Sequence, residues 1–125
     1  MNRKEIIVRD IVFRGKCKEK WIYGNLIIDG AGNPHINTLD EKIDPETVGQ
    51  YTGMRDKNGQ RIFEGDIIEA NNGHKGYVKF VDGQFNSFCY CHGGAGCDIY
   101  SDNARVIGNI YDNPELLEKD AKKGK

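Results

Sequence analysis

Hydrophobic residues in this chain occur in short runs that are separated by turns rich in glycine, asparagine and aspartate. The runs contain many β-branched and aromatic residues, and few stretches follow helical spacing. They predict strands over residues 6–13, 21–28, 48–51, 67–70, 77–81, 85–90 and 106–111. The pattern therefore predicts an all-β fold, an antiparallel sandwich or barrel of short strands.

Three polar segments predict where the chain turns. Residues 14–20 are charged and contain a glycine, so they predict an exposed turn between the first two strands. Residues 29–34, with the sequence DGAGNP, fit either a boundary between two lobes or a long hairpin loop. The segment DKNG at residues 56–59 predicts a tight hairpin, with Asn58 and Gly59 at the positions of positive φ.

Helical structure is predicted at two places only. Asp44 can cap a brief helical turn that opens on Pro45. Asn113 and Pro114 predict the start of a short C-terminal helix, because asparagine caps helices well and proline fits their first turn. Residues 118–125 are highly charged and predict a flexible tail.

Length and composition favour a single domain over residues 1–125, within which residues 1–45 and 46–117 are candidate lobes. A chain of 125 residues can build its core without a metal or disulfides. The net charge of −1 argues against a protein that coats nucleic acid through a general basic field. The N-terminus has no unbroken apolar segment and no run is long enough to span a bilayer, so we expect a cytoplasmic protein with reduced cysteines and no membrane partner.

Three blocks of sequence resemble a known family. The segment WIYGNL at residues 21–26, the central block at 48–68 (VGQYTGMRDKNGQRIFEGDII) and the closing block at 106–117 (VIGNIYDNPELL) are similar, in order, to signatures of the YopX-like proteins. The resemblance implies a largely antiparallel β fold and an origin in phage or prophage genomes of Gram-positive bacteria. The family has no assigned biochemical activity, so it supplies no catalytic residues and implies no enzyme.

The glycines of the central block predict architecture. Gly49, Gly53, Gly59 and Gly65 fall where a small barrel must turn, bulge or bring two backbones close together. Phe63 predicts an aromatic plug beside the turn that precedes the next strand. The alternative is a recognition loop presented on a rigid frame.

Thiol and imidazole groups cluster late in the chain. Cys89, Cys91, His92 and Cys97 are the residue types that bind zinc, and they form the candidate metal site. Their spacing is irregular for a zinc knuckle, and half-buried reduced cysteines beside a glycine-rich loop are the alternative. A Cys–His nucleophile is a further reading, although adjacent side chains on a strand diverge. Apart from this candidate zinc ion, no cofactor is predicted.

The sequence after residue 65 has the character of an SH3-like barrel, with a strand, a glycine-rich turn and a second strand. Such barrels bind nucleic acid or peptides through loops and exposed aromatic side chains. Lys75, Tyr77 and Lys79 form the candidate binding surface, supported by Phe85, Phe88 and Tyr90. The alternative is that these aromatic side chains fill the core.

We therefore expect a non-enzymatic phage or prophage accessory protein that acts through binding. Its partner would be another protein or a second copy of itself, as in a homo-oligomer. Nucleic-acid binding by the small barrel is the alternative function, and a zinc-dependent module built on the Cys/His cluster is the third.

Overall fold

The computed structural model describes residues 10–71, 73–88, 96–97 and 104–117. In these ranges the chain forms short strands, one 3₁₀ turn η2 (Pro45–Thr47) and a helical turn at residues 115–117. The strands are β1 (Phe13–Cys17), β2 (Lys20–Gly24), β3 (Leu26–Ile28), β4 (Pro34–Ile36), β5 (Gly49–Arg55), β6 (Arg61–Phe63), β7 (Asp66–Ala70), β8 (Lys75–Val81), β9 (Gln84–Phe88), β10 (Gly96–Cys97) and β11 (Ala104–Asn109). Every described strand pair is antiparallel, which confirms the predicted all-β class.

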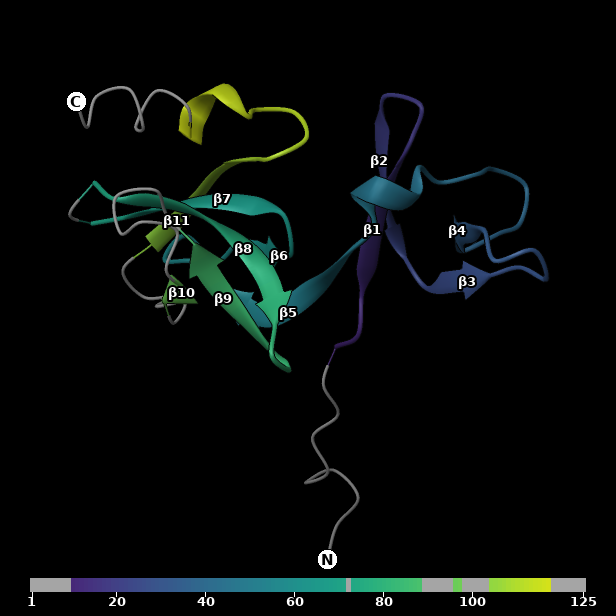
Figure 1. Ribbon diagram of the computed structural model, residues 1–125, viewed down its shortest axis with the longest axis horizontal. Coiled ribbons are helices and arrows are strands. Elements are labelled where there is room, and N and C mark those ends of the chain that lie inside the picture. Colours follow the sequence, from purple (N-terminus) through teal and green to yellow (C-terminus); the bar gives the residue numbers. More distant parts are fainter. Residues whose placement is uncertain (1–9, 72, 89–95, 98–103, 118–125) are drawn as a thin grey trace, which may run out of the picture.

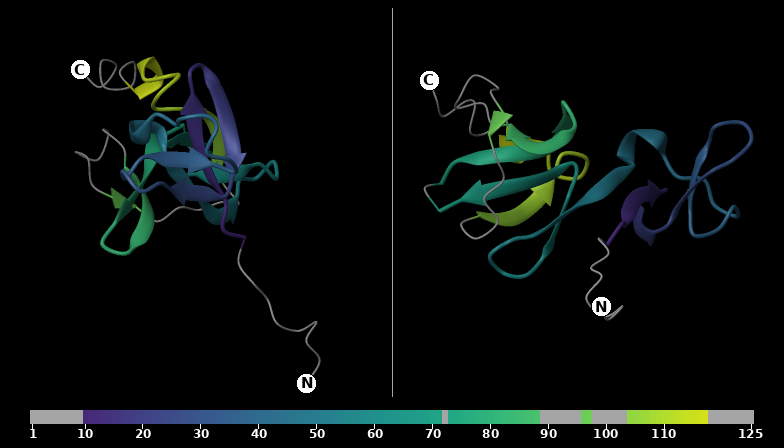
Figure 2. Two further views of the ribbon diagram at one scale, coloured as in Figure 1. Left: turned by 90° about the vertical axis from the view of Figure 1, so that its right-hand side faces the viewer. Right: turned by 90° about the horizontal axis from the view of Figure 1, so that it is seen from below.

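The strands form two lobes that are joined through β5 (Figure 1). A five-stranded sheet of order β10-β9-β8-β7-β11 curls into half of a barrel, which we call the half-barrel lobe. The hairpin lobe (residues 10–47) contains the β1–β2 hairpin and the small β3–β4 sheet. Figure 2 shows the two lobes at opposite ends of an elongated molecule.

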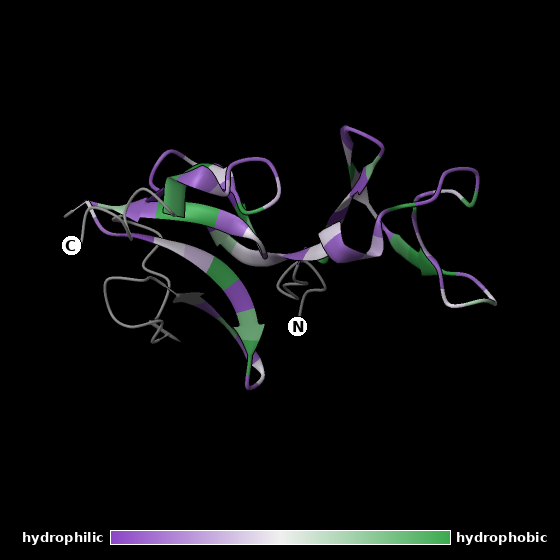
Figure 3. Ribbon diagram, turned by 45° about the horizontal axis from the view of Figure 1, so that its top comes forward, coloured by the Kyte–Doolittle hydropathy of each residue, from purple (hydrophilic) through white to green (hydrophobic). Residues whose placement is uncertain are grey.

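The core lies on the inner side of the half-barrel. Ile62 and Val78 are almost completely buried, and Ile68 and Ala104 pack with them. Strand β7 is apolar in its middle and polar toward its ends, whereas apolar and polar residues alternate along the later part of β8 (Figure 3). These buried positions lie on β6, β7, β8 and β11, so the core holds segments together that are far apart in the sequence.

Strand β5 belongs to both lobes. Its first residues pair with β1, through Phe13 and Arg14, and its later residues pair with β6. The start of the strand requires glycine, because a Cβ at Gly49 would lie 2.7 Å from the backbone oxygen of Glu64. A register shift follows between Tyr51 and Arg55, as predicted for a glycine-rich strand that bulges.

The predicted exposed turn at residues 14–20 is wrong. Residues 14–17 belong to β1, Arg14 is buried, and only Lys18 and Glu19 form the turn. The reason is that the charged side chains of this strand meet carboxylates from the half-barrel lobe, which a local pattern does not reveal. The strand predicted over residues 21–28 is also interrupted, at Asn25, where the side chain of Asn37 accepts a hydrogen bond from the backbone.

The remaining turns follow the sequence closely. Residues 29–33 form a hairpin loop between β3 and β4, and Asp29 accepts hydrogen bonds from two of its backbone amides. Asp44 caps η2, with Pro45 in its first turn. In the turn at residues 56–59 only Gly59 has a positive φ, so the positive φ predicted for Asn58 is wrong. Leu117 in the C-terminal helical turn is buried. Among the described residues, no helix is long and apolar enough to cross a membrane.

Candidate functional site

A cleft separates the β1–β2 hairpin from the half-barrel lobe, and we call it the inter-lobe cleft. It consists of two adjoining hollows of about 340 and 250 Å³ that share Arg14, Tyr23 and Gln60 in their walls. The larger hollow is also lined by Trp21, Asp66, Val106, Ile107, Gly108, Asn109 and Asp112. The smaller hollow is completed by Arg55, Gly59, Arg61 and Phe63.

Arg14 lies at the centre of the cleft wall. Its guanidinium stacks between the rings of Trp21 and Phe63, with 4.6 and 4.9 Å between the guanidinium carbon and the ring centroids. Its Nη2 lies 2.9 Å from Oδ1 of Asp66, and both side chains are buried. Burial raises the pKa of Asp66, while the charge of Arg14 acts in the opposite direction.

One buried nitrogen of Arg14 forms no hydrogen bond with the described residues. Its Nη2 also donates to the carbonyl oxygen of Glu64 at 3.3 Å, but its Nε is buried and has no hydrogen-bond partner among the described residues. Buried polar atoms are nearly always paired, so an unpaired guanidinium nitrogen calls for an explanation. Arg14 forms part of the wall of both hollows, although its side chain is buried.

A second ion pair includes Asp112, which lines the larger hollow. Nζ of Lys16 lies 2.6 Å from Oδ1 of Asp112, and Nε1 of Trp21 donates to Oδ2 of Asp112 at 2.7 Å. These two hydrogen bonds lower the pKa of Asp112 to about 2. Lys16 and Arg14 share one face of β1 because side chains alternate along a strand, so the hairpin presents two cations to the half-barrel lobe.

The smaller hollow contains two opposed arginines. Arg55 and Arg61 are direct partners across the β5–β6 hairpin. Nη1 of Arg55 donates to the carbonyl oxygen of Gly59 at 2.9 Å, and the guanidinium of Arg61 lies 5.2 Å from the ring centroid of Tyr51. Arg61 reaches only an exposed carboxylate, Asp10, at 3.8 Å, and no carboxylate in the described part of the chain forms an ion pair with Arg55. The hollow is therefore rich in positive charge that is weakly compensated.

An aromatic wall runs beside these arginines. Tyr23 packs edge-on against Phe63 at 5.4 Å between ring centroids, and Phe63 packs against Tyr51 at 5.6 Å. Phe63 is buried, as predicted for an aromatic plug, whereas half of the surface of Tyr23 is exposed. Tyr23 thus presents an open ring to the cleft.

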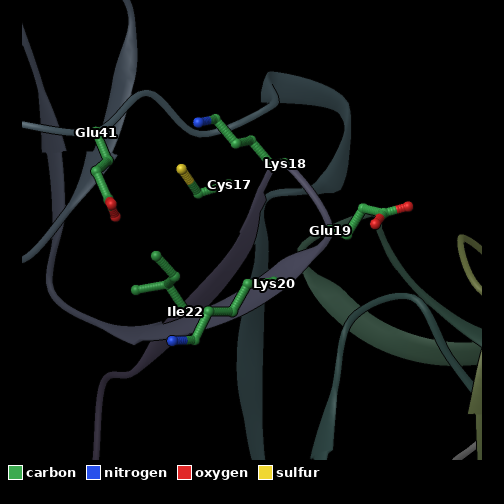
Figure 4. A pocket seen from close by; sticks show the side chains of 6 residues that line it. All are labelled: Cys17, Lys18, Glu19, Lys20, Ile22 and Glu41. Carbon is green, nitrogen blue, oxygen red and sulfur yellow. The ribbon is translucent and has the colours of Figure 1, made fainter.

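A separate hollow of about 380 Å³ lies on the opposite face of the β1–β2 hairpin. It is lined by Cys17, Lys18, Glu19, Lys20, Ile22 and Glu41. Figure 4 shows the Cys17 sulfur and the Glu41 carboxylate pointing into it. Cys17 is a half-buried free thiol. The charges around it have mixed signs, so the hollow selects no class of ligand by charge.

The predicted binding surface lies elsewhere, on β8. Lys75, Tyr77 and Lys79 occupy alternate positions of this strand and share one face of the sheet. Tyr77 is half-buried, Lys79 is exposed, and Nζ of Lys75 lies 4.0 Å from a carboxylate oxygen of Glu69. Of the supporting aromatics, Phe85 packs against the core, which fits the alternative that these side chains fill it.

The predicted zinc ligands lie mostly outside the described residues. Cys89, Cys91 and His92 are not described, and neither is Tyr90 of the candidate surface. Of Cys97 the structure describes the backbone, in β10, which pairs with β9. Among the described residues no group of three or more His, Cys, Asp or Glu side chains could hold a metal.

Sequence reasoning missed Arg14, Tyr23, Arg55 and Arg61. The sequence does indicate that Arg55 and Arg61 are neighbours, because they flank the predicted hairpin turn. Antiparallel pairing places such residues opposite each other. Tyr23 could be placed on one face with Trp21 by strand alternation. Nothing local to the sequence predicts that this face meets the half-barrel lobe.

Comparison with known proteins connects this architecture to relatives. The model of the YopX protein family matches residues 8–118 of the chain. Among solved structures, protein EF1440 from Enterococcus faecalis is similar over 88% of this chain and 99% of its own, with a TM-score of 0.56 and 24% sequence identity. At that identity the likeness shows the fold alone. No match was found among curated proteins.

Proposed function

This chain belongs to the YopX family, and from that premise we propose that it is a phage or prophage accessory protein that binds a partner in its inter-lobe cleft. It acts without catalysis, in the cytoplasm of a bacterial host. The cleft is the binding site because it joins an open aromatic ring to weakly compensated positive charge.

The observation that carries this proposal is the opposed pair Arg55 and Arg61. Like charges placed directly opposite on neighbouring strands repel each other and destabilise the hairpin. The only described ion pair of these arginines is the 3.8 Å contact with the exposed Asp10, which contributes little to stability. A binding partner that carries negative charge would relieve this repulsion.

The state of Asp112 supports binding rather than catalysis, because this carboxylate is fixed in two hydrogen bonds. Asp66 pairs with Arg14, and Asp112 is held by Lys16 and Trp21. A general acid or base needs a proton that it can exchange with a substrate near neutral pH. The pKa of Asp112 is lowered to about 2, so this group stays ionised and serves as a structural link between the lobes.

Affinity capture from a phage-induced bacterial lysate tests the proposal. The tagged wild-type protein is compared with the double variant Arg55→Ala/Arg61→Ala, whose side chains lie at the surface and whose loss leaves the core intact. We expect the double variant to lose a component that the wild type retains.

The matched control is Lys20→Ala. Lys20 is an exposed cation on β2, but it lines the hollow on the opposite face of the hairpin. It should retain the same components as the wild type. If the double variant captures everything that the wild type captures, the cleft is not the binding site.

A further inference from the structure

We propose that the partner held in the inter-lobe cleft is a single-stranded nucleic acid, with phosphates on Arg55 and Arg61 and a base stacked on Tyr23. This inference rests on the proposed function, because it uses the same cleft, and it goes further by naming the chemical class of the ligand.

The arginine pair fits phosphate. Guanidinium groups bind phosphate through two parallel N–H···O bonds, a geometry that a lysine does not provide. Arg55 uses one Nη1 hydrogen bond to the carbonyl oxygen of Gly59, which positions the side chain and leaves its other donors for a ligand. Arg61 is 38% exposed and is held against the ring of Tyr51, so it too is positioned before a ligand arrives.

The open ring of Tyr23 fits a base. Half of its surface is exposed, and its edge-on packing against Phe63 fixes the orientation of the ring. A fixed, exposed aromatic ring beside positive charge is the arrangement by which small β proteins bind single strands, because every base has a π face. A carboxylate of an acidic peptide would satisfy the arginines but would leave this ring unused.

The shape of the cleft favours a single strand over a duplex or a compact ligand. The hollow beside the arginines measures about 250 Å³, below the range of roughly 300–1,000 Å³ that holds a whole drug-sized ligand. It continues into the hollow at Trp21, which shares three residues of its wall. A flexible chain can thread two small adjoining hollows with successive nucleotides, whereas a paired base is stacked inside its helix and cannot reach Tyr23.

The acidic residues of the cleft do not oppose a polyanion strongly. Asp66 is buried against Arg14, and Asp112 is bonded to Lys16 and to the indole of Trp21. Each negative charge is therefore matched by a cation within hydrogen-bonding distance. Among the described residues, no carboxylate lies within hydrogen-bonding distance of the arginines of the smaller hollow, so the ligand-facing charge is positive at that end.

Binding can be measured with a fluorescent oligothymidylate of about 12 nucleotides, within the range of roughly 4–16 that small barrels occupy. Trp21 is the single tryptophan of the chain and lines the cleft, so its fluorescence gives a second readout. We expect Tyr23→Ala to weaken binding on the order of tenfold through lost stacking. We expect Arg55→Ala/Arg61→Ala to weaken it further and to flatten its dependence on salt, since each lost phosphate contact reduces the slope by about 0.7.

Control variants and competing ligands decide the outcome. Lys20→Ala should bind as the wild type does, and a duplex of equal length or a polyglutamate should bind at least tenfold more weakly than the single strand. Equal binding of polyglutamate would overturn the inference, as would oligonucleotide binding that is lost in Lys79→Ala and kept in the cleft variants. If no oligonucleotide binds while the cleft variants still lose a component in affinity capture, the ligand class is wrong and the proposed function stands.

Discussion

Single residues show how this small protein uses polar groups inside its fold. Arg14, His35 and Asp66 are all buried; Arg14 and Asp66 form an ion pair, and His35 lies against the carboxylate of Asp29. Breaking a buried ion pair by removing one partner is costly, because an uncompensated charge stays behind. The unpaired Nε of Arg14 is the exception among the described side chains, and it lies in the residue that forms the wall of both hollows of the cleft.

The stability contributed by His35 should depend on pH. Its Nε2 lies 2.8 Å from Oδ2 of Asp29 and its Nδ1 lies 3.0 Å from the carbonyl oxygen of Glu41, so both nitrogens meet acceptors and the doubly protonated ring fits best. The hydrogen bond with Asp29 raises the pKa of His35, helped by the bond to Glu41 and opposed by burial and by Lys42. The bond with His35 lowers the pKa of Asp29.

The pH dependence of stability follows from the raised pKa of His35 and the lowered pKa of Asp29. The contribution of His35 is complete below its ordinary pKa of 6.5 and is lost as the pH rises through the raised value. The contribution of Asp29 is complete above its ordinary pKa of 3.8 and is lost on strong acidification. Urea unfolding should therefore show a larger difference between the wild type and His35→Gln at about pH 5.5 than at about pH 8. A difference that is equal at both values would show that the ring is neutral in the folded protein.

At the scale of elements, the turn between β5 and β6 depends on one carboxylate. Oδ1 of Asp56 accepts hydrogen bonds from the amides of Asn58 and Gln60 at 2.9 and 2.8 Å. Its Oδ2 accepts a bond from the amide of Val106 at 2.9 Å, so the same side chain fixes the turn to β11. Burial alone would raise the pKa of Asp56, but these backbone hydrogen bonds outweigh it and lower the pKa.

Replacing Asp56 with alanine should destabilise the protein by about 3 kcal/mol, because three backbone donors lose a charged acceptor in a buried position. Chemical denaturation measures this change as a lower urea midpoint with an unchanged slope. Asn58→Ala, in the same turn but exposed, is the matched control and should stay within about 0.5 kcal/mol of the wild type. A loss below about 1 kcal/mol for Asp56→Ala would mean that water replaces these bonds.

The elements also show which parts of the fold a sequence can predict. The cap at Asp44, the hairpin strands β7 and β8 and the C-terminal helical turn were predicted, because turn residues and strand alternation act locally. Strand β1 was predicted as a turn, because its charges become buried only when Asp66 and Asp112 arrive from distant segments. The cleft could not be predicted for the same reason, although the pairing of Arg55 with Arg61 could have been derived from the predicted hairpin.

At the scale of the whole molecule, the two lobes form one structural unit. Strand β1 pairs with β5, and β5 pairs in turn with β6, so a single sheet of order β2-β1-β5-β6 crosses between the lobes. The ion pairs Arg14–Asp66 and Lys16–Asp112 add side-chain links across the same boundary. Separation of the lobes would break the ion pair between Arg14 and Asp66 and would leave the paired edges of β1 and β5 without partners.

We therefore expect the chain to unfold in one transition. Trp21 fluorescence reports on the hairpin lobe and its contact with Asp112, while far-ultraviolet circular dichroism reports on all strands. The two probes should give the same midpoint in a single urea titration, as expected for two-state unfolding. A Trp21 transition at clearly lower urea than the main circular-dichroism transition would show that the hairpin lobe detaches first.

The closeness of Gly49 to Glu64 also has a consequence for how this chain can evolve. At Gly49 any larger residue would press its Cβ against a backbone oxygen, which cannot rotate aside as a side chain can. At Gly30 a Cβ would meet nothing within 4 Å, so mutations there can accumulate. Lineages that descend from this protein should therefore vary at Gly30 and remain fixed at the first residue of β5. The position that tolerates substitution least lies at the start of β5, the strand that joins the two lobes.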